Sequence, residues 1–301
     1  MGTAVVAAVV LVGCATTTGG PNSRGDWNLT PSVESTTPTD VSSTPKSDHA
    51  QAIELPPTGA SFDYQLGGAY EPPFGVEIVV RDRLATPSDG RYSICYVNAF
   101  QTQPGELDVW PDDLLLHNAG GALVYDPDWP DEALVDTREA DRIIAIVAPW
   151  ITGCADAGYD AVEFDNLDTY TRTEGLLSRA DNLALATALV NIAHDVGLAA
   201  AQKNAAEDAA LLHSQAGFDF AIAEECVAYD ECDAYTAVYG DHVLAVEYTD
   251  SGSRSADDGT GPRASLTEIC VSPGRPASLV LRDRALATPT ESGYVFALCP
   301  D

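Results

Sequence analysis

The feature that most constrains the fold of this chain is a regular alternation of short β-forming runs with longer helical segments. Strands are expected at 61–66, 92–97, 122–125, 161–165, 198–202, 218–223, 242–247 and 278–281. Between them, 139–157 and 182–196 carry apolar residues at spacings of three and four, which is typical of amphipathic helices. Strand–helix–strand repetition favours parallel pairing. Eight such units over residues 55–301 predict an α/β fold, a single-domain (β/α)8 TIM barrel.

An open, doubly wound sheet is the alternative α/β architecture. Such sheets often bind dinucleotides through a glycine-rich turn, and no GxGxxG motif follows any expected strand. The segments 79–97 and 279–299 also resemble each other, and each is interpreted as a strand, a polar turn containing proline, and a second strand. The barrel is therefore the preferred fold.

The chain is strongly acidic, with 46 Asp and Glu against 15 Lys and Arg and a net charge of −31. Duplex nucleic acids and anionic lipid surfaces are bound largely through basic side chains, so this balance argues against both as partners. The acidity suits a cationic substrate. It is also what a solubility device or an adaptation to salt would produce.

The N-terminus carries an apolar run at 2–13 followed by Cys14. The run is too short to span a bilayer and fits the hydrophobic region of a signal peptide. Residues 11–14 resemble a bacterial lipobox, which predicts lipidation of Cys14 and an extracellular or cell-surface protein; an ordinary cleaved signal is the alternative. Residues 15–54 are rich in Ser, Thr and Pro and predict a disordered linker between the signal peptide at 1–14 and the folded domain at 55–301.

The six remaining cysteines are an even number, which after an export signal suggests three disulfides. Six cysteines allow 15 connectivities, so the pairing stays open. We favour Cys226 with Cys232 across a short loop, Cys270 with Cys299 near the C-terminus, and Cys95 with Cys154 as the remaining pair. Zinc is the competing interpretation, but no CxxC spacing or neighbouring His pair is present, and no metal is expected.

Three of the expected strands end in acidic side chains. They are Asp165 and Asp168, with the amide Asn166 between them, at the first strand, Glu224 and Glu225 at the second, and Glu247 at the third. In (β/α)8 barrels the carboxyl ends of the strands carry catalysis. Paired carboxylates are what glycosidic hydrolysis needs, one to protonate the leaving oxygen and one to attack or stabilise the anomeric centre. One alternative is that acidic residues fall at strand ends by chance, because the chain is so acidic. The other is a metal site with oxygen ligands, although the spacing of an EF-hand is missing.

Four segments carry a family resemblance: GYDAVEFDNLDTY at 158–170, AHDVGLAAAQKNAAE at 193–207, FDFAIAEECVAYDEC at 218–232 and VLAVEY at 243–248. Together with FDYQL, ICYVNA and WPDEALVDTRE upstream, they resemble glycoside hydrolase family 114, the endo-α-1,4-polygalactosaminidases. The resemblance covers roughly 58–250 and implies a (β/α)8 barrel that cleaves α-linked galactosamine chains without a cofactor. It places the family's catalytic Asp on Asp165 and its catalytic Glu on Glu224.

The chemistry assigns Asp165 as nucleophile, or as base if the enzyme inverts, and Glu224 as general acid with a pKa raised by Glu225 and Asp165. The reverse assignment stays open. Candidates for substrate contacts are Asp63, Tyr64, Tyr96, Asn166, Asp168, Tyr170, Lys203, Asn204, Glu225, Glu247 and Tyr248. For Lys203 a second interpretation has equal weight, in which it is a buried partner that neutralises the acidic residues at the barrel mouth. The tryptophans at 110, 129 and 150 are expected to be packing residues.

The predicted protein is thus a monomeric, surface-tethered glycosidase that cleaves a cationic, galactosamine-containing polysaccharide internally. A non-catalytic lipoprotein that binds amino-sugar polymers is the first rival hypothesis, since it needs the same acidic cleft without a matched acid and nucleophile. A barrel hydrolase acting on a different glycan is the second.

Overall fold

The computed structural model describes residues 53–250 and 265–300. The expected signal peptide with Cys14, and the expected linker up to residue 52, lie outside these described residues. No helix in the described part of the chain is long and apolar enough to cross a membrane.

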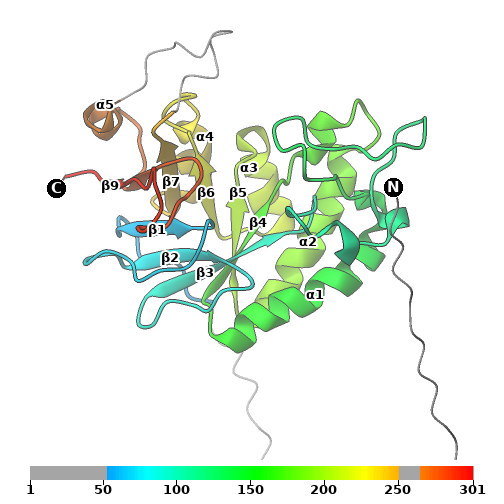
Figure 1. Ribbon diagram of the computed structural model, residues 1–301, viewed down its shortest axis with the longest axis horizontal. Coiled ribbons are helices and arrows are strands. Elements are labelled where there is room, and N and C mark those ends of the chain that lie inside the picture. Colours follow the sequence, from blue (N-terminus) through cyan, green and yellow to red (C-terminus); the bar gives the residue numbers. More distant parts are fainter. Residues whose placement is uncertain (1–52, 251–264, 301) are drawn as a thin grey trace, which may run out of the picture. The chain divides into compact units, whose positions relative to one another are not determined.

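Eight parallel strands follow one another in chain order around a barrel (Figure 1). They are β1 (Phe62–Gln65), β2 (Ile78–Asp82), β3 (Tyr92–Asn98), β4 (Ala161–Asp165), β5 (Ala199–Lys203), β6 (Phe220–Glu224), β7 (Val243–Tyr248) and β8 (Ser278–Arg282), and β9 (Phe296–Leu298) runs antiparallel to β8. The barrel nearly closes where β8 meets β1. There the Arg282 guanidinium donates to the Tyr64 carbonyl and lies 2.7 Å from the Asp63 carboxylate. The predicted (β/α)8 barrel is confirmed.

The helices cover only part of the barrel. They are α1 (Ala140–Ala157), α2 (Arg179–Asp195), α3 (Ala209–Leu211), α4 (Cys232–Tyr239) and α5 (Leu266–Val271), with 3-10 turns η1 (Leu107–Val109), η2 (Asp112–Leu114), η3 (Thr137–Glu139), η4 (Thr169–Arg172) and η5 (Ala206–Asp208), and a π turn η6 (Leu212–Ala216). In Figure 1 the long helices α1 and α2 lie side by side outside the barrel, and β1, β2 and β3 are joined by loops without helices.

Most predicted elements are found close to their expected bounds, with three differences. Helix α2 begins three residues earlier than predicted because Ser178 caps it and Asp181 completes a capping box. The predicted strand at 122–125 is wrong, since these residues form only isolated antiparallel bridges within the loop between β3 and α1. Strand β2 was not among the eight expected strands, although it overlaps the first strand of the repeated segment 79–97.

Side chains of the strands alternate between two cores, as a barrel requires. On β6, Phe220 and Ile222 fill the interior, whereas Ala221 and Ala223 pack outward toward the helices. The same alternation on β4 sends Val162 outward and points every second residue toward the barrel axis.

Three disulfides tie the barrel to its connections. Cys226–Cys232, Cys270–Cys299 and Cys95–Cys154 are all formed, so the favoured pairing is confirmed. Three bridges fit an extracellular protein, because structural disulfides persist mainly in oxidising compartments.

Candidate active site

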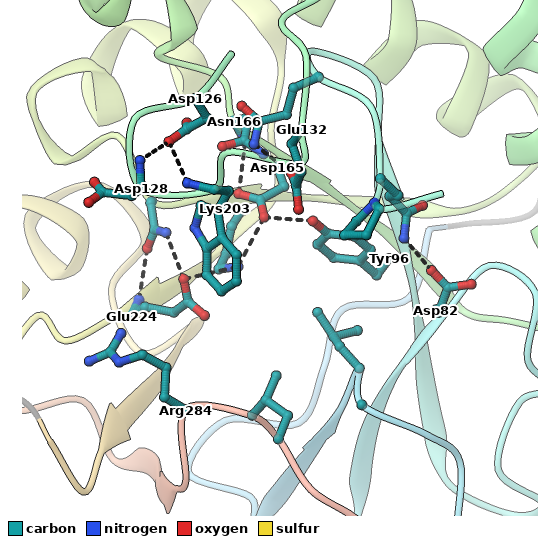
Figure 2. A pocket seen from close by; sticks show the side chains of 18 of the residues that line it. Asp82, Tyr96, Asp126, Asp128, Glu132, Asp165, Asn166, Lys203, Glu224 and Arg284 are labelled. Carbon is teal, nitrogen blue, oxygen red and sulfur yellow. Dashed lines mark hydrogen bonds and ion pairs between the residues drawn. The ribbon is translucent and has the colours of Figure 1, made fainter. Parts of the chain in front are cut away.

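Three neighbouring strands end in charged side chains that point into one cavity of about 530 Å³ (Figure 2). Asp165 ends β4, Lys203 ends β5 and Glu224 ends β6. The cavity is lined by Leu66, Gly67, Asp82, Tyr96, Gln101, Gln103, Pro104, Asp126, Asp128, Trp129, Glu132, Asp165, Asn166, Arg172, Lys203, Asn204, Glu224, Glu225, Tyr248, Arg284, Ala285 and Leu286. It therefore lies at the carboxyl end of the barrel, where active sites of this fold are found.

The residue after each of these three side chains turns the chain sharply. Asn166, Asn204 and Glu225 have φ angles of 60°, 51° and 57°, in the left-handed region that non-glycine residues seldom adopt. Such backbone costs about 1–3 kcal/mol per residue and persists where surrounding contacts fix it. Asn204 supplies one such contact, because its amide accepts from the Glu224 N–H at 2.8 Å and donates to the Glu224 carboxylate at 3.0 Å.

Asp165 is held by three donors. The Tyr96 hydroxyl donates to Oδ2 at 2.8 Å, the backbone N–H of Asn166 donates to Oδ1 at 2.7 Å, and Lys203 Nζ lies 3.3 Å from Oδ2. A carboxylate accepts up to about four hydrogen bonds, so these three donors fix its orientation. Its side chain remains 15% exposed, on the cavity side.

Glu224 is fixed in a similar way by Tyr248, Asn204 and Lys203. The Tyr248 hydroxyl donates to Oε1, and Lys203 Nζ lies 3.2 Å from Oε2. Burial acts to raise the pKa of Glu224, but the Lys203 charge and the hydrogen bonds from Tyr248 and Asn204 outweigh it and lower this pKa below its usual value. The expectation that neighbouring acids raise this pKa is therefore wrong, because the lysine lies closer than was foreseen.

Lys203 is the central cation of the site, and only 2% of its side chain is exposed. Burial acts to lower its pKa, but Asp165, Glu224 and Glu163 outweigh this effect and raise it well above the ordinary value, so the amine is protonated. Figure 2 shows it between the two catalytic candidates. Lys203 is thus the buried partner of these acids, and it also lines the cavity. In the described part of the chain no group of three acids, cysteines or histidines is arranged to hold a metal ion.

Glu163 is a third carboxylate at this site, and it was not among the predicted site residues. It is fully buried, accepts from the Tyr64 hydroxyl at 2.7 Å and lies 3.5 Å from Lys203 Nζ. Burial is the main cause that raises its pKa to about 7, with Lys203 acting in the opposite direction. The alternation of β4 places Glu163 on the same face as Asp165, and that signal was present in the sequence.

The outer wall of the cavity comes from the loop between β3 and α1. Asp126, Asp128, Trp129 and Glu132 line it, and burial is the main cause that raises the pKa of Glu132 to about 7. The expectation that all three tryptophans pack is wrong for Trp129, which is 50% exposed, whereas Trp110 is buried.

The structure brings together eight of the predicted site residues: Tyr96, Asp165, Asn166, Lys203, Asn204, Glu224, Glu225 and Tyr248. Five others do not line the cavity. Asp63 pairs with Arg282 at the β1–β8 seam, Tyr64 lies beneath the cavity, and Glu247 faces outward and accepts from the Val227 N–H. Asp168 pairs with Arg172, and Tyr170 donates to Asp208.

The chain is similar to known glycoside hydrolases in sequence and in fold. The family model of glycoside hydrolase family GH114 matches residues 42–301. Ega3 from Aspergillus fumigatus, in its crystal structure with galactosamine, is 23% identical with a TM-score of 0.65, over 82% of this chain and 98% of Ega3. The glycoside hydrolase domain of PelA from Pseudomonas aeruginosa is 15% identical with a TM-score of 0.53, over 76% of this chain and 96% of that domain. Curated proteins gave no match. The two structures bear on the fold, and the family match over most of the sequence shows that the chain belongs to family GH114 and is a glycoside hydrolase.

Proposed function

We propose that this protein cleaves α-1,4-linked galactosamine polysaccharide internally, with Asp165 and Glu224 as the reacting carboxylates. One observation carries the proposal: Asp165 Oδ2 and Glu224 Oε2 both lie within 3.3 Å of Lys203 Nζ, in the open mouth of a GH114 barrel. Glycosidic hydrolysis needs two such carboxyl groups on either side of the scissile bond.

The separation of the two groups supports a retaining mechanism. The nearest oxygens of the two groups, Asp165 Oδ2 and Glu224 Oε2, can be no farther apart than about 6.5 Å, because they lie 3.3 Å and 3.2 Å from the same nitrogen. Retaining enzymes hold their carboxyl groups about 5–5.5 Å apart and inverting enzymes about 6.5–9.5 Å apart. In this mechanism Asp165 attacks the anomeric carbon while Glu224 protonates the leaving oxygen. Glu224 then deprotonates the water that releases the sugar from Asp165.

Exposure supports this division of roles. The Glu224 side chain is 24% exposed against 15% for Asp165, so Glu224 exchanges protons with water more readily. Its lowered pKa leaves it ionised in the free enzyme near neutral pH, so Glu224 must take up a proton before it can act as the acid. Activity at low substrate, kcat/KM, should therefore fall as the pH rises above the pKa of Glu224. If Glu224 were the nucleophile instead, kcat/KM would rise over that range.

The cavity's charge supports an amino-sugar substrate with free ammonium groups. Its carboxylates outnumber its three cations, and each cation is already paired. Arg172 lies 2.9 Å from Asp126, Arg284 lies 2.8 Å from Glu225, and Lys203 lies between the two reacting carboxylates. Trp129 adds an exposed ring of the kind that stacks on sugars or cations. The galactosamine in the Ega3 structure and the GH114 match agree with this substrate class.

The proposal is tested by incubating the purified protein with α-1,4-polygalactosamine and following the product sizes by mass spectrometry. Internal cleavage releases a ladder of oligosaccharides early, and NMR of the first products gives their anomeric configuration. Asp165→Asn and Glu224→Gln should each lose at least about a hundredfold in turnover, as general acid–base contributions imply. Asp168→Asn, which changes a nearby acid outside the cavity, is the matched control. Turnover retained by both variants would refute the assignment.

Two further measurements resolve the details. A fluorinated, mechanism-based galactosaminide labels the nucleophile, and the labelled peptide distinguishes Asp165 from Glu224. An N-acetylated form of the same polymer tests whether the ammonium groups matter. Faster cleavage of the acetylated polymer would identify a different glycan as the substrate.

The N-terminal sequence supports attachment to the cell surface. The lipobox-like residues 11–14 predict a diacylated Cys14, and two acyl chains suffice for stable anchoring. Mass spectrometry of the N-terminal peptide should show the lipid on Cys14, and Cys14→Ser should release the protein into the medium. Size-exclusion chromatography of the released form is expected to show a monomer.

A further inference from the structure

Beneath the two reacting carboxylates, Glu163, Tyr64 and Lys203 form a buried chain of contacts. Glu163 precedes Asp165 by two residues on β4 and faces the same barrel interior. Its Oε1 accepts from the Tyr64 hydroxyl at 2.7 Å, and the Tyr64 oxygen in turn accepts from Lys203 Nζ at 2.9 Å. Neither Glu163 nor Tyr64 has any exposed surface, so neither contacts substrate.

We propose that Glu163 is a positioning residue that, through Tyr64 and Lys203, sets the orientation and charge balance of the ammonium between Asp165 and Glu224. The inference rests on the proposed function, because it concerns how that pair is kept ready for the reaction. Its consequence is that the ionisation of Glu163 governs the pH range in which the pair works.

The contacts of Lys203 explain how Glu163 affects the orientation of its ammonium group. A protonated lysine has three N–H donors. The three nearest acceptors of Lys203 are the Tyr64 hydroxyl at 2.9 Å, Glu224 Oε2 at 3.2 Å and Asp165 Oδ2 at 3.3 Å. The donors are thereby all used, and the contact with Glu163 at 3.5 Å is electrostatic. Glu163 therefore acts on the lysine by its charge and by holding the Tyr64 hydroxyl in place.

The charges around Glu163 explain why its ionisation affects the pH dependence of the reaction. The charged and titratable groups around Glu163 and Lys203 are Tyr64 on β1, Tyr96 on β3, Asp165 on β4, Glu224 on β6 and Tyr248 on β7. Lys203 is the cation among them, and one oxygen of Glu163 has no hydrogen-bond partner within the described residues. When Glu163 loses its proton, the new negative charge beside Lys203 opposes ionisation of Glu224 and raises the pKa of Glu224 relative to its value with Glu163 protonated. The general acid then keeps its proton to a higher pH.

The experiment compares pH profiles of kcat and KM for the wild type and Glu163→Gln on polygalactosamine. Glutamine keeps the shape and the acceptor for Tyr64 but removes the charge. Glu163 Oε1 and Glu224 Oε2 are no more than about 6.7 Å apart, because they lie 3.5 Å and 3.2 Å from the same nitrogen. At an effective dielectric constant of about 20, unit charges at that distance shift a pKa by about two units. The alkaline limb of kcat/KM should therefore move to lower pH by up to about two units, a loss of up to about a hundredfold on the limb, with KM unchanged.

Glu247→Gln is the matched control. Glu247 is equally buried and its pKa is also raised to about 7, but it faces the outside of β7 and does not contact Lys203. It should leave the pH profile unchanged. Tyr64→Phe keeps the ring and removes the hydroxyl, so it should lower kcat at every pH, and Glu163→Asp should restore part of the wild-type profile.

A second readout separates this inference from the proposed function. The ¹³C carboxyl resonance of Glu224, assigned from its Gln variant, should titrate at lower pH in Glu163→Gln than in the wild type. This needs no turnover, so a wild type that leaves polygalactosamine intact refutes the function alone. If the Glu224 resonance did not shift, or if kcat fell while the pH profile stayed unshifted, Glu163 would have only a packing role and the inference would be overturned.

Discussion

Glu247 makes the most direct prediction of how the stability of this fold depends on pH. It lies on the outer face of β7, fully buried, where Oε1 accepts from the Val227 N–H at 2.8 Å and Oε2 has no hydrogen-bond partner among the described residues. Burial is the main cause that raises its pKa to about 7, and the charge of Glu225 adds to it. An ionised Glu247 is therefore costly in the folded state.

The size of this cost follows from the pKa of Glu247 in the two states. Because the folded pKa of about 7 lies above the unfolded value of 4.5, the folded state binds the proton more tightly. The stabilisation is complete below the unfolded pKa and is lost as the pH rises through the folded pKa. At about 1.4 kcal/mol per pKa unit the whole effect is about 3 kcal/mol, most of it lost between pH 5 and 8.5.

Glu247→Gln isolates this group, because it keeps an acceptor for Val227 but cannot ionise. Its new amide N–H₂ lacks an acceptor, which costs about 1–3 kcal/mol at every pH. Denaturant unfolding with disulfides intact should thus show a variant less stable than the wild type at pH 5. By pH 8.5 that difference should shift by about 2–3 kcal/mol in the variant's favour. A difference that stays constant from pH 5 to 8.5 would refute the reasoning.

Three further predictions concern substrate binding and the disulfides. Trp129→Ala should raise KM for polygalactosamine about fivefold and leave kcat nearly unchanged, because loss of one exposed stacking ring costs about 1 kcal/mol; an unchanged KM would exclude a platform role. KM for the cationic polymer should rise with salt, whereas an acetylated polymer should show no such rise in kinetic assays at 50 and 500 mM salt. Removing Cys95–Cys154, which closes 59 residues, should cost about 4 kcal/mol in calorimetry, against about 2 kcal/mol for Cys226–Cys232, which closes 6; equal losses would contradict the loop-entropy argument.

The sequence was informative wherever strand periodicity decides the outcome. Asp165 and Glu224 were predicted because each lies where an apolar run ends, and the family resemblance selected these two among the acids there. The same alternation makes Glu247 face away from the cavity once Tyr248 faces inward, and it makes Glu163 face the axis with Asp165. The positions of Glu163 and Glu247 could therefore have been predicted by applying strand alternation to every position of β4 and β7.

The loop between β3 and α1 lay beyond sequence reasoning. Trp129 and Glu132 line the cavity because the loop folds back over the barrel mouth, where Leu116 and Leu134 are buried against Leu177 in a small cluster. No regular period marks such a segment, and its short bridges resemble a strand only locally. The direction of the pKa shift of Glu224 could not be predicted either, because it depends on how closely Lys203 Nζ approaches the Glu224 carboxylate oxygens.

The order acid, lysine, acid on consecutive strands explains why this site can hold a sugar. Neighbouring strands lie about 4.8 Å apart, so the ends of β4 and β6 are separated by about 10 Å across β5. Side chains that lean toward the axis shorten this gap to the few ångströms that a glycosidic bond requires, and a cation on β5 reaches both. Two acids on adjacent strands would leave no place for the lysine, and their mutual repulsion would raise the pKa of one of them until only one remained ionised. The skipped strand thus supplies both the room for the sugar and the charge that allows two carboxylates to share it.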